Sequence, residues 1–124
     1  SATTRLDDSL LATGFPPLRD RAPDNNFATF MKLKRTAQAI RRCGSAAMDL
    51  AMVADGTYEG YWEHKLKPWD LAAGAVLVSE AGGTVSAFDG GVADVTTGDL
   101  VASNGHVHRE LLEALRDVEA MDPL

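Results

Sequence analysis

Hydrophobic residues along the chain form short apolar runs that alternate with helix-like spacings. Residues 9–15 are an apolar run stopped by Pro16-Pro17, which predicts a strand that enters a loop. From Phe27 the apolar spacing is partly helical and fades near Ala39, and residues 40–44 then predict a connector or short strand. The polar residues before this helix are candidate caps, namely Asp24, Asn25 and Asn26.

A second helix is predicted after Ser45, which stands in an N-cap position ahead of an apolar series. The turn signal Asp55-Gly56 should end this helix, and residues 57–63 interleave aromatic and polar side chains as a strand does. Residues 69–81 are apolar nearly all round, which predicts a helix buried in the centre of the domain. Gly82-Gly83 should end this third helix.

The C-terminal part of the pattern completes an α/β alternation. Two short strands are predicted over 84–88 and 99–103, and a last helix over 106–118 carries an apolar stripe. Alternating strands and helices are typical of a sheet covered by helices. The sequence has no internal repeat or interdomain linker, so residues 1–124 are interpreted as one α/β domain.

Composition and charge narrow the partners. The chain is 45% hydrophobic with a formal net charge of −6, which fits a globular domain and argues against nucleic acid, because binding a phosphate backbone needs a cationic face. The same acidity argues against adsorption to membranes, and the longest apolar stretch, 71–78, is too short to span one. Cys43 is the only cysteine, and no secretory signal is visible, so we expect a cytoplasmic protein without a disulfide.

Asp70 is the most informative polar residue. Pro68 favours an extended Lys67, so Asp70 falls in the first turn of the third helix. A carboxylate there gains about 0.3–1 kcal/mol from the helix dipole, and helix capping is the simpler interpretation of the spacing alone. A carboxylate oxygen is also a suitable ligand for Mg²⁺. The spacing leaves both roles open.

Other residues of this region allow two interpretations each. Gly74 costs about 1 kcal/mol relative to alanine inside a helix, which predicts a close approach of a neighbouring element. Glu80 is unfavourably placed for the helix dipole, and both a solvent-facing and a buried hydrogen-bonded position remain open. Judged on its position alone, Glu63 is an exposed carboxylate at a strand end.

A series of ordered segments resembles the inositol monophosphatase family. Residues 69–74, Trp-Asp-Leu-Ala-Ala-Gly, and residues 80–83, Glu-Ala-Gly-Gly, are similar to the C-terminal signature of that family. The remaining segments of the resemblance are 12–16, 41–50, 55–63 and 101–104. The resemblance therefore covers most of the chain in register.

The resemblance implies a fold and a reaction. The fold would be the C-terminal half of a layered αβαβα sandwich, with a mixed sheet flanked by helices. The reaction would be Mg²⁺-dependent hydrolysis of inositol monophosphate, or a related polyol or sugar phosphate, by a metal-activated water. Fructose 1,6-bisphosphate, histidinol phosphate and 3′-phosphoadenosine phosphate are rival substrates within the same class.

The resemblance also implies roles for individual residues. Asp70 matches the aspartate that ligates a catalytic metal, and Glu63 matches the glutamate that contacts a substrate hydroxyl. Gly44, Ser45 and Ala46 match the turn and helix start that lie against the sugar or inositol ring. The last role agrees with physical chemistry, because a helix N-terminus offers unpaired amides to such a ligand.

Most of the metal site of this family comes from its first half, with a helix glutamate and an Asp-Pro-x-Asp-(Gly/Ser)-Thr motif. That motif does not occur here. Asp55-Gly56-Thr57 matches only the last three positions of the motif. Asp122-Pro123 matches only its first two positions and is followed by a single residue. We therefore expect the N-terminal metal and phosphate domain to be absent from these residues, no catalytic residue in this chain, and little turnover by the chain alone.

Three interpretations follow from the incomplete site. The chain is part of a phosphatase, it is a non-catalytic half-domain such as a remnant or interaction module, or it assembles with a separate N-terminal chain. The expected partners are a small-molecule phosphate monoester and either a second copy in a homodimer or the N-terminal half. Apolar surface left where the first half should pack would favour such association.

Overall fold

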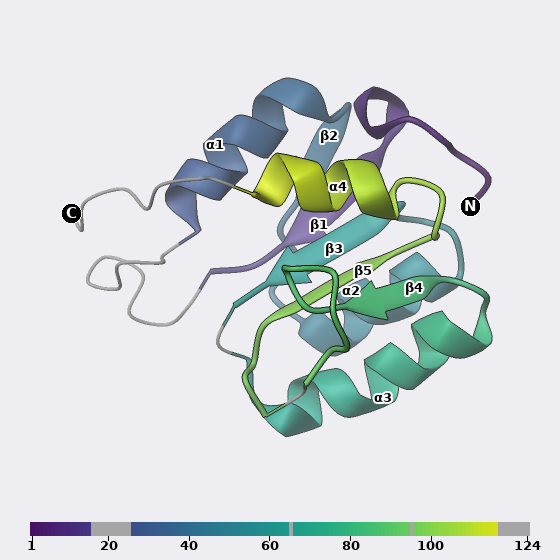
Figure 1. Cartoon of the computed structure of the whole chain (residues 1–124). Coiled ribbons are helices and arrows are strands. Elements are labelled where there is room, and N and C mark those ends of the chain that lie inside the picture. Colours follow the sequence, from purple (N-terminus) through teal and green to yellow (C-terminus); the bar gives the residue numbers. More distant parts are fainter. Residues whose placement is uncertain (16–25, 65, 95, 117–124) are drawn as a thin grey trace.

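The fold is a mixed sheet covered by helices, seen in a computed structural model that describes residues 1–15, 26–64, 66–94 and 96–116 (Figure 1). Its strands are β1 (Leu10–Thr13), β2 (Ala39–Arg41), β3 (Gly60–Glu63), β4 (Thr84–Ser86) and β5 (Leu100–Ser103). Its helices are the short 3-10 helix η1 (Leu6–Asp8), α1 (Phe27–Thr36), α2 (Ala46–Ala54), α3 (Pro68–Glu80) and α4 (His108–Leu115).

The five strands pair in the order β2-β1-β3-β5-β4. β1 is parallel to both neighbours, with Leu11 opposite Ile40 of β2 and Gly60 of β3. β5 is antiparallel to both β3 and β4, so that Ala102 stands opposite Tyr61 and Val85. Because β1, β2 and β3 run the same way, their carboxyl ends meet at one edge of the sheet, where ligands of open α/β sheets commonly bind.

The sheet separates two hydrophobic clusters. Adjacent residues of a strand face opposite sides, so Tyr61 belongs to the cluster beneath α2 and α3, whereas Trp62 belongs to the cluster beneath α1 and α4. Leu11 and Ala12 of β1 are divided in the same way. The result is a three-layer arrangement with α1 and α4 on one face and α2 and α3 on the other (Figure 1).

Several helices begin or end where local sequence signals predicted. Ser45 caps α2, because its Oγ accepts a hydrogen bond from the Met48 amide at 3.3 Å. The helix ends before Asp55, at the predicted turn. α3 ends before the Gly82-Gly83 pair, where Gly82 adopts a φ of 87°.

The other boundaries differ from the prediction by a few residues. The strand predicted over 57–63 begins at Gly60, because Thr57 and Tyr58 close the turn after α2, with the Tyr58 amide donating to Met52. The last two strands and the last helix lie within the predicted ranges but are shorter. Among the predicted positions, residues 117–118 and Pro16-Pro17 lie outside the described residues.

Asn26 does not cap α1 with its side chain, contrary to the prediction. It occupies the N-cap position in a left-handed conformation, with a φ of 75° and no capping hydrogen bond from its side chain. The amide group is instead used inside the core, where its Oδ1 accepts from the Trp62 indole at 2.8 Å. The other two candidate caps, Asp24 and Asn25, lie outside the described residues.

The prediction that α3 lies buried in the centre of the domain is wrong. Leu71, Gly74 and Val78 are buried, but Trp69 is 76% exposed and Val76 is 61% exposed. α3 packs against α2 and the sheet on one side only, so its remaining apolar residues face outward. A helix that is apolar on every side is suited to burial. The pattern does not tell whether other residues of this chain pack on all of its sides.

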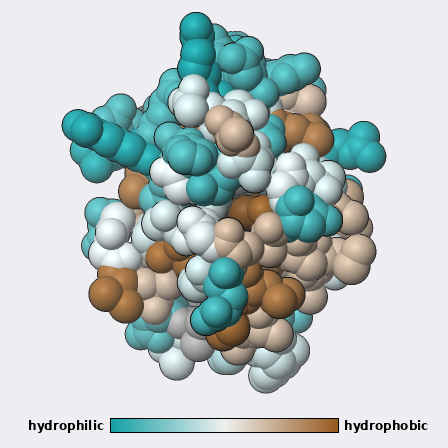
Figure 2. Space-filling model, turned by 90° about the vertical axis from the view of Figure 1, so that its right-hand side faces the viewer, coloured by the Kyte–Doolittle hydropathy of each residue, from teal (hydrophilic) through white to brown (hydrophobic). Residues whose placement is uncertain are grey.

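The surface reflects this one-sided packing. Figure 2 shows more hydrophobic side chains in its lower part, at the level where α2 and α3 lie in Figure 1, than in its upper part. The large exposed apolar side chains are Met31, Met48, Trp69, Val76, Leu77 and Val92. In the described part of the chain, no helix has the length and apolar character needed to cross a membrane.

Candidate functional site

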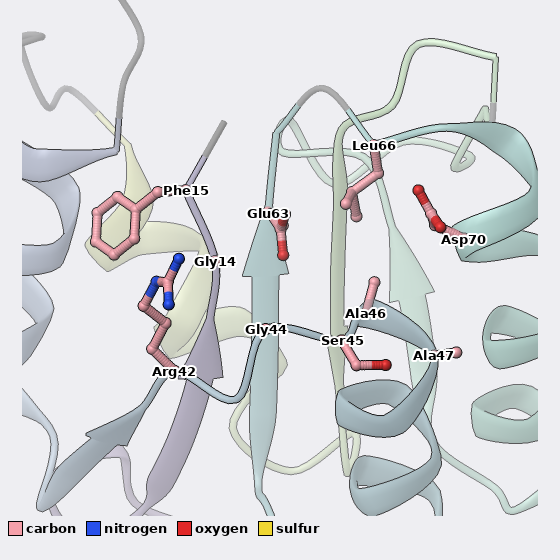
Figure 3. A pocket seen from close by; sticks show the side chains of 10 residues that line it. All are labelled: Gly14, Phe15, Arg42, Gly44, Ser45, Ala46, Ala47, Glu63, Leu66 and Asp70. Atoms are coloured by element: carbon pink, nitrogen blue, oxygen red, sulfur yellow. The ribbon is translucent and has the colours of Figure 1, made fainter. Parts of the chain in front are cut away.

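A pocket of about 290 Å³ opens at the carboxyl edge of the parallel strands (Figure 3). All five residues proposed from the sequence line it, namely Gly44, Ser45, Ala46, Glu63 and Asp70. The other lining residues are Gly14, Phe15, Arg42, Ala47 and Leu66. The fold therefore gathers residues that are far apart in the sequence into one cavity.

Strand ends and helix starts build the pocket. Gly14 follows β1, Glu63 ends β3, and the β2–α2 connection supplies Arg42 and Gly44. The N-termini of α2 and α3 both begin at this edge. Because the first amides of a helix have no partner within the helix, two helix starts make the pocket suited to oxygen-rich or anionic ligands.

Gly44 gives the α2 side of the pocket its shape. Its φ of +81° lies in the left-handed region that favours glycine, and a Cβ at Gly44 would meet no atom within 4 Å. The requirement is therefore conformational, since the turn must bring Ser45 into the N-cap position of α2. The Ser45 hydroxyl accepts a hydrogen bond from the Met48 amide, and Ser45 and Ala46 both line the cavity.

Glu63 lies between Gly14 and Tyr61. The Tyr61 hydroxyl donates to Glu63 Oε1 at 2.5 Å. On the other side, a Cβ at Gly14 would lie 2.3 Å from the same Oε1, so only glycine leaves room for this carboxylate position. The position of Glu63 at a strand end suggested an exposed carboxylate. In the structure Glu63 is half-buried and held in place.

The charges around Glu63 oppose one another. Burial raises the pKa of Glu63 most strongly, while the hydrogen bond from Tyr61 lowers it. The carboxylates of Asp49 and Asp70 raise that pKa further, and the guanidinium of Arg42 lowers it. The net effect is a raised pKa for Glu63, which Tyr61 and Arg42 partly offset.

Asp70 caps the helix on which it lies. Its Oδ2 accepts a hydrogen bond from the Lys67 amide at 3.2 Å, and the side chain is half-buried. The capping interpretation is thus confirmed, and it does not exclude metal binding because a carboxylate has about four lone-pair sites. In the described ranges, no group of three or more His, Cys, Asp or Glu side chains could hold a metal ion.

Arg42 and Phe15 form a side of the pocket that the sequence did not reveal. The Arg42 guanidinium carbon lies 5.9 Å from the centroid of the Phe15 ring, within the range of a cation–π contact. In Figure 3 these two side chains stand on the opposite side of Glu63 from Asp70. The pocket consequently presents a cation and two carboxylates to the same space. No local pattern marks either residue.

Asp49 is a buried carboxylate on α2. Asp49 is 1% exposed, and its Oδ1 has no hydrogen-bond partner among the described residues. Burial raises the pKa of Asp49 to about 6, an effect that a hydrogen bond with Cys43 partly offsets.

Comparison with known proteins decides the family. The family model described as the inositol monophosphatase family matches residues 1–120. The chain belongs to this family. The prediction of an α/β fold with a mixed sheet flanked by helices is confirmed by the solved inositol monophosphatase from Anabaena (Nostoc) sp., with a TM-score of 0.94 and 47% identity over 98% of this chain and 50% of that one.

Two curated relatives have sequences of high similarity. An inositol-1-monophosphatase from Synechocystis sp. is 51% identical over 93% of this chain and 40% of its own length. The Nus factor SuhB from Escherichia coli is 44% identical over 94% of this chain and 44% of its own length. The chain thus spans less than half the length of these two relatives.

Proposed function

We propose that this chain forms the polyol-binding half of a Mg²⁺-dependent phosphomonoesterase that hydrolyses inositol monophosphate or a related polyol or sugar phosphate. The observation that carries the proposal is the convergence of Glu63, Asp70 and the Gly44 turn on one pocket. Membership of the inositol monophosphatase family supports the same reaction class. The name of the Synechocystis relative favours inositol monophosphate as the first substrate to test.

Each side of the pocket has a defined task in this proposal. The Glu63 carboxylate accepts a hydrogen bond from a ring hydroxyl, and the backbone at Ser45 and Ala46 lies against the ring. Asp70 contributes one carboxylate oxygen to Mg²⁺, a cation that takes one or two carboxylates together with substrate phosphate and water. The bound cation would supply charge neutralisation at the phosphoryl oxygens and an activated water.

We further propose that the site is incomplete in this chain. Among the described residues that line the pocket, the only carboxylates are Asp70 and Glu63, and Glu63 serves the substrate hydroxyl in this proposal. The remaining ligands would come from an N-terminal half that packs on the exposed apolar side chains of α2 and α3, such as Met48, Val76 and Leu77. A homodimer through the same side chains is the alternative assembly.

Reconstitution tests the proposal. The chain is assayed for phosphate release from inositol monophosphate with Mg²⁺, alone and together with the N-terminal part of the Synechocystis relative, added separately or fused. We expect little turnover alone and a rate in the enzyme range of about 1–10³ s⁻¹ after reconstitution. Such a rate from the chain alone would show that its site is complete. An inactive reconstituted protein would favour a non-catalytic interaction module, the role left open by the relative named as a Nus factor.

Two variants separate metal binding from helix capping. Asp70→Asn keeps a side-chain oxygen for the Lys67 amide but removes the charge, so the reconstituted enzyme should lose activity and need more Mg²⁺. Asp89→Asn is the matched control, because Asp89 Oδ1 also accepts from a backbone amide, that of Gly91 at 2.8 Å, but does not line the pocket. Unchanged Mg²⁺ dependence in Asp70→Asn would remove Asp70 from the metal site. A panel with the rival phosphate monoesters then selects the substrate.

A further inference from the structure

The hydrogen bond between Tyr61 and Glu63 follows from their places on β3. Residues two apart on a strand face the same side of the sheet, so both side chains lie on the α2–α3 side. Tyr61 is fully buried there, and its hydroxyl reaches Glu63 Oε1 at 2.5 Å. For a buried phenol, a carboxylate is a strong acceptor, because hydrogen bonds to ionised groups are shorter and stronger than neutral ones.

The Glu63 carboxylate is also confined from the β1 side. A Cβ at Gly14 would fall 2.3 Å from Oε1 and 2.9 Å from Oε2. The carboxylate thus occupies the space that any other residue at position 14 would fill. The Tyr61 hydroxyl bonds Glu63 Oε1, and among the described residues none donates a hydrogen bond to Oε2. Because Glu63 lines the pocket, its second oxygen can accept a hydrogen bond from a ligand there.

The charges around Glu63 oppose its ionisation, which the Tyr61 hydroxyl favours. Asp49 on α2 and Asp70 at the start of α3 both oppose ionisation of Glu63, and burial opposes it most. Among the described residues, the Tyr61 hydroxyl and the Arg42 guanidinium favour the carboxylate. Burial and the nearby charge of Glu63 raise the pKa of Tyr61, so the phenol keeps its proton and remains a donor.

We infer that Tyr61 is a positioning residue, whose hydroxyl holds the Glu63 carboxylate so that Oε2 accepts a hydrogen bond from a substrate hydroxyl. This inference rests on the proposed function. It makes Tyr61 a determinant of specificity for phosphate monoesters that carry a free hydroxyl on the ring. Esters without such a hydroxyl gain nothing from the arrangement.

The first test uses the 124-residue chain and requires no activity. The side-chain carboxyl carbon of Glu63 is titrated by NMR in the wild type, in Tyr61→Phe and in Tyr58→Phe. Tyr61→Phe should raise the pKa of Glu63, because the donor to the charged form is lost. Tyr58→Phe is the matched control, since it removes the hydroxyl of another buried tyrosine, one that contacts Cys43 Sγ at 3.2 Å instead. An unchanged titration in Tyr61→Phe would overturn the inference.

The second test compares two substrates in the reconstituted enzyme. With inositol monophosphate, Tyr61→Phe should raise KM about tenfold while kcat changes less, as expected when one hydrogen bond to the bound substrate is lost. With p-nitrophenyl phosphate, which has no ring hydroxyl, both constants should stay near the wild-type values. Glu63→Gln should show the same selective loss, and Tyr61→Phe should add little to it, because both changes remove one interaction.

The outcomes distinguish this inference from the proposed function. A wild-type enzyme without phosphatase activity would overturn the proposed function, and the substrate role of Tyr61 with it. An active wild type whose Tyr61→Phe variant loses both substrates equally would overturn the inference alone, since the change would then be a general structural defect. A selective loss that is absent from Tyr58→Phe supports the positioning role.

Discussion

Gly74 of α3 lies directly against Leu50 of α2. A Cβ at Gly74 would fall 2.5 Å from Leu50 Cδ1 and 2.6 Å from Leu50 Cβ, well inside van der Waals contact. The close approach that the sequence predicted at this glycine is therefore confirmed, and the approaching element is a helix. It accounts for a residue that costs about 1 kcal/mol relative to alanine in a helix interior.

Gly74→Ala should lower the free energy of unfolding. The added methyl group must displace Leu50 near its backbone, and overpacking of this kind costs typically about 1–3 kcal/mol, more than the gain in helix propensity. Urea denaturation measures the change. Gly74→Ala combined with Leu50→Ala should recover part of the loss relative to the sum of the single variants, whereas additive effects would show that the two residues are not in conflict.

Asn26→Ala should be among the most destabilising single changes outside the apolar core. The Asn26 amide donates to Thr13 Oγ1 at 2.9 Å and to the Gly14 carbonyl at 2.7 Å, and it accepts from the Trp62 indole. Loss of these buried partners should cost roughly 2–4 kcal/mol in thermal or urea unfolding.

Asn26→Gly provides the comparison for Asn26→Ala. Both variants lose the side chain, but the φ of 75° at Asn26 suits glycine and strains alanine. Asn26→Gly should therefore be about 1 kcal/mol more stable than Asn26→Ala. Equal stabilities would show that the left-handed backbone contributes no strain at this position.

The features that the sequence revealed are those with local causes. Ser45 could be assigned as a helix cap because capping involves residues only three positions apart, and the pair Gly82-Gly83 ends a helix through its own backbone freedom. Asp70 was likewise found as a first-turn carboxylate. These signals position the pocket because its walls are helix starts and strand ends.

The features that the sequence did not reveal depend on which elements meet. Asn26 looked like a cap, but its amide bonds to residues of two strands, and the partner Trp62 is 36 positions away. The link from Tyr61 to Glu63 requires knowing that this face of β3 turns toward α2 and α3. Trp69 is exposed because no described element packs on that side of α3. The spacing of apolar residues along a helix does not predict which elements pack against it.

Asp49→Asn should raise stability at neutral and alkaline pH. Burial raises the pKa of Asp49 in the folded protein to about 6, above the ordinary value of about 3.9 in an unfolded chain. The folded state therefore binds the proton more tightly, so the destabilisation by Asp49 is greatest above pH 6 and is relieved as the pH falls toward 4. Asparagine removes this effect, which should be on the order of 1–3 kcal/mol at pH 8 and small at pH 4.

Asp94→Asn provides a contrast for Asp49→Asn. Hydrogen bonds from the Thr96 hydroxyl and amide lower the pKa of Asp94, so its charged form is favoured in the folded state. Removing that charge should reduce stability at neutral pH, opposite in sign to Asp49→Asn. If both variants shift urea midpoints in the same direction, burial is not the dominant cause at Asp49.

A buried hydrogen-bonded chain ties α4 to the edge of the sheet. His108 Nε2 and Nδ1 each lie 2.8 Å from a serine hydroxyl, those of Ser86 and Ser103. Ser86 donates its own proton to the Ala87 carbonyl, so it must accept from Nε2–H. Ser103 accepts from the Gly105 amide and can therefore donate to an unprotonated Nδ1. The hydrogen bonds of Ser86, His108 and Ser103 can all form only if His108 is neutral.

Stability should consequently fall on acidification through His108. Burial lowers the pKa of His108, so the unfolded state, with a pKa of about 6.5, takes up the proton first. The stability contributed by neutral His108 is complete above about pH 6.5 and decreases as the pH falls toward the lower folded pKa, with a slope of up to about 1.4 kcal/mol per pH unit.

Urea midpoints of the wild type and His108→Gln should therefore differ most at pH 8 and converge toward pH 5. His106→Gln, at an exposed histidine of the same segment, should follow the wild-type profile. Because Asp49 acts with the opposite sign over an overlapping range, the comparison is sharpest in the Asp49→Asn background. Parallel curves there would show that His108 is not the group that titrates.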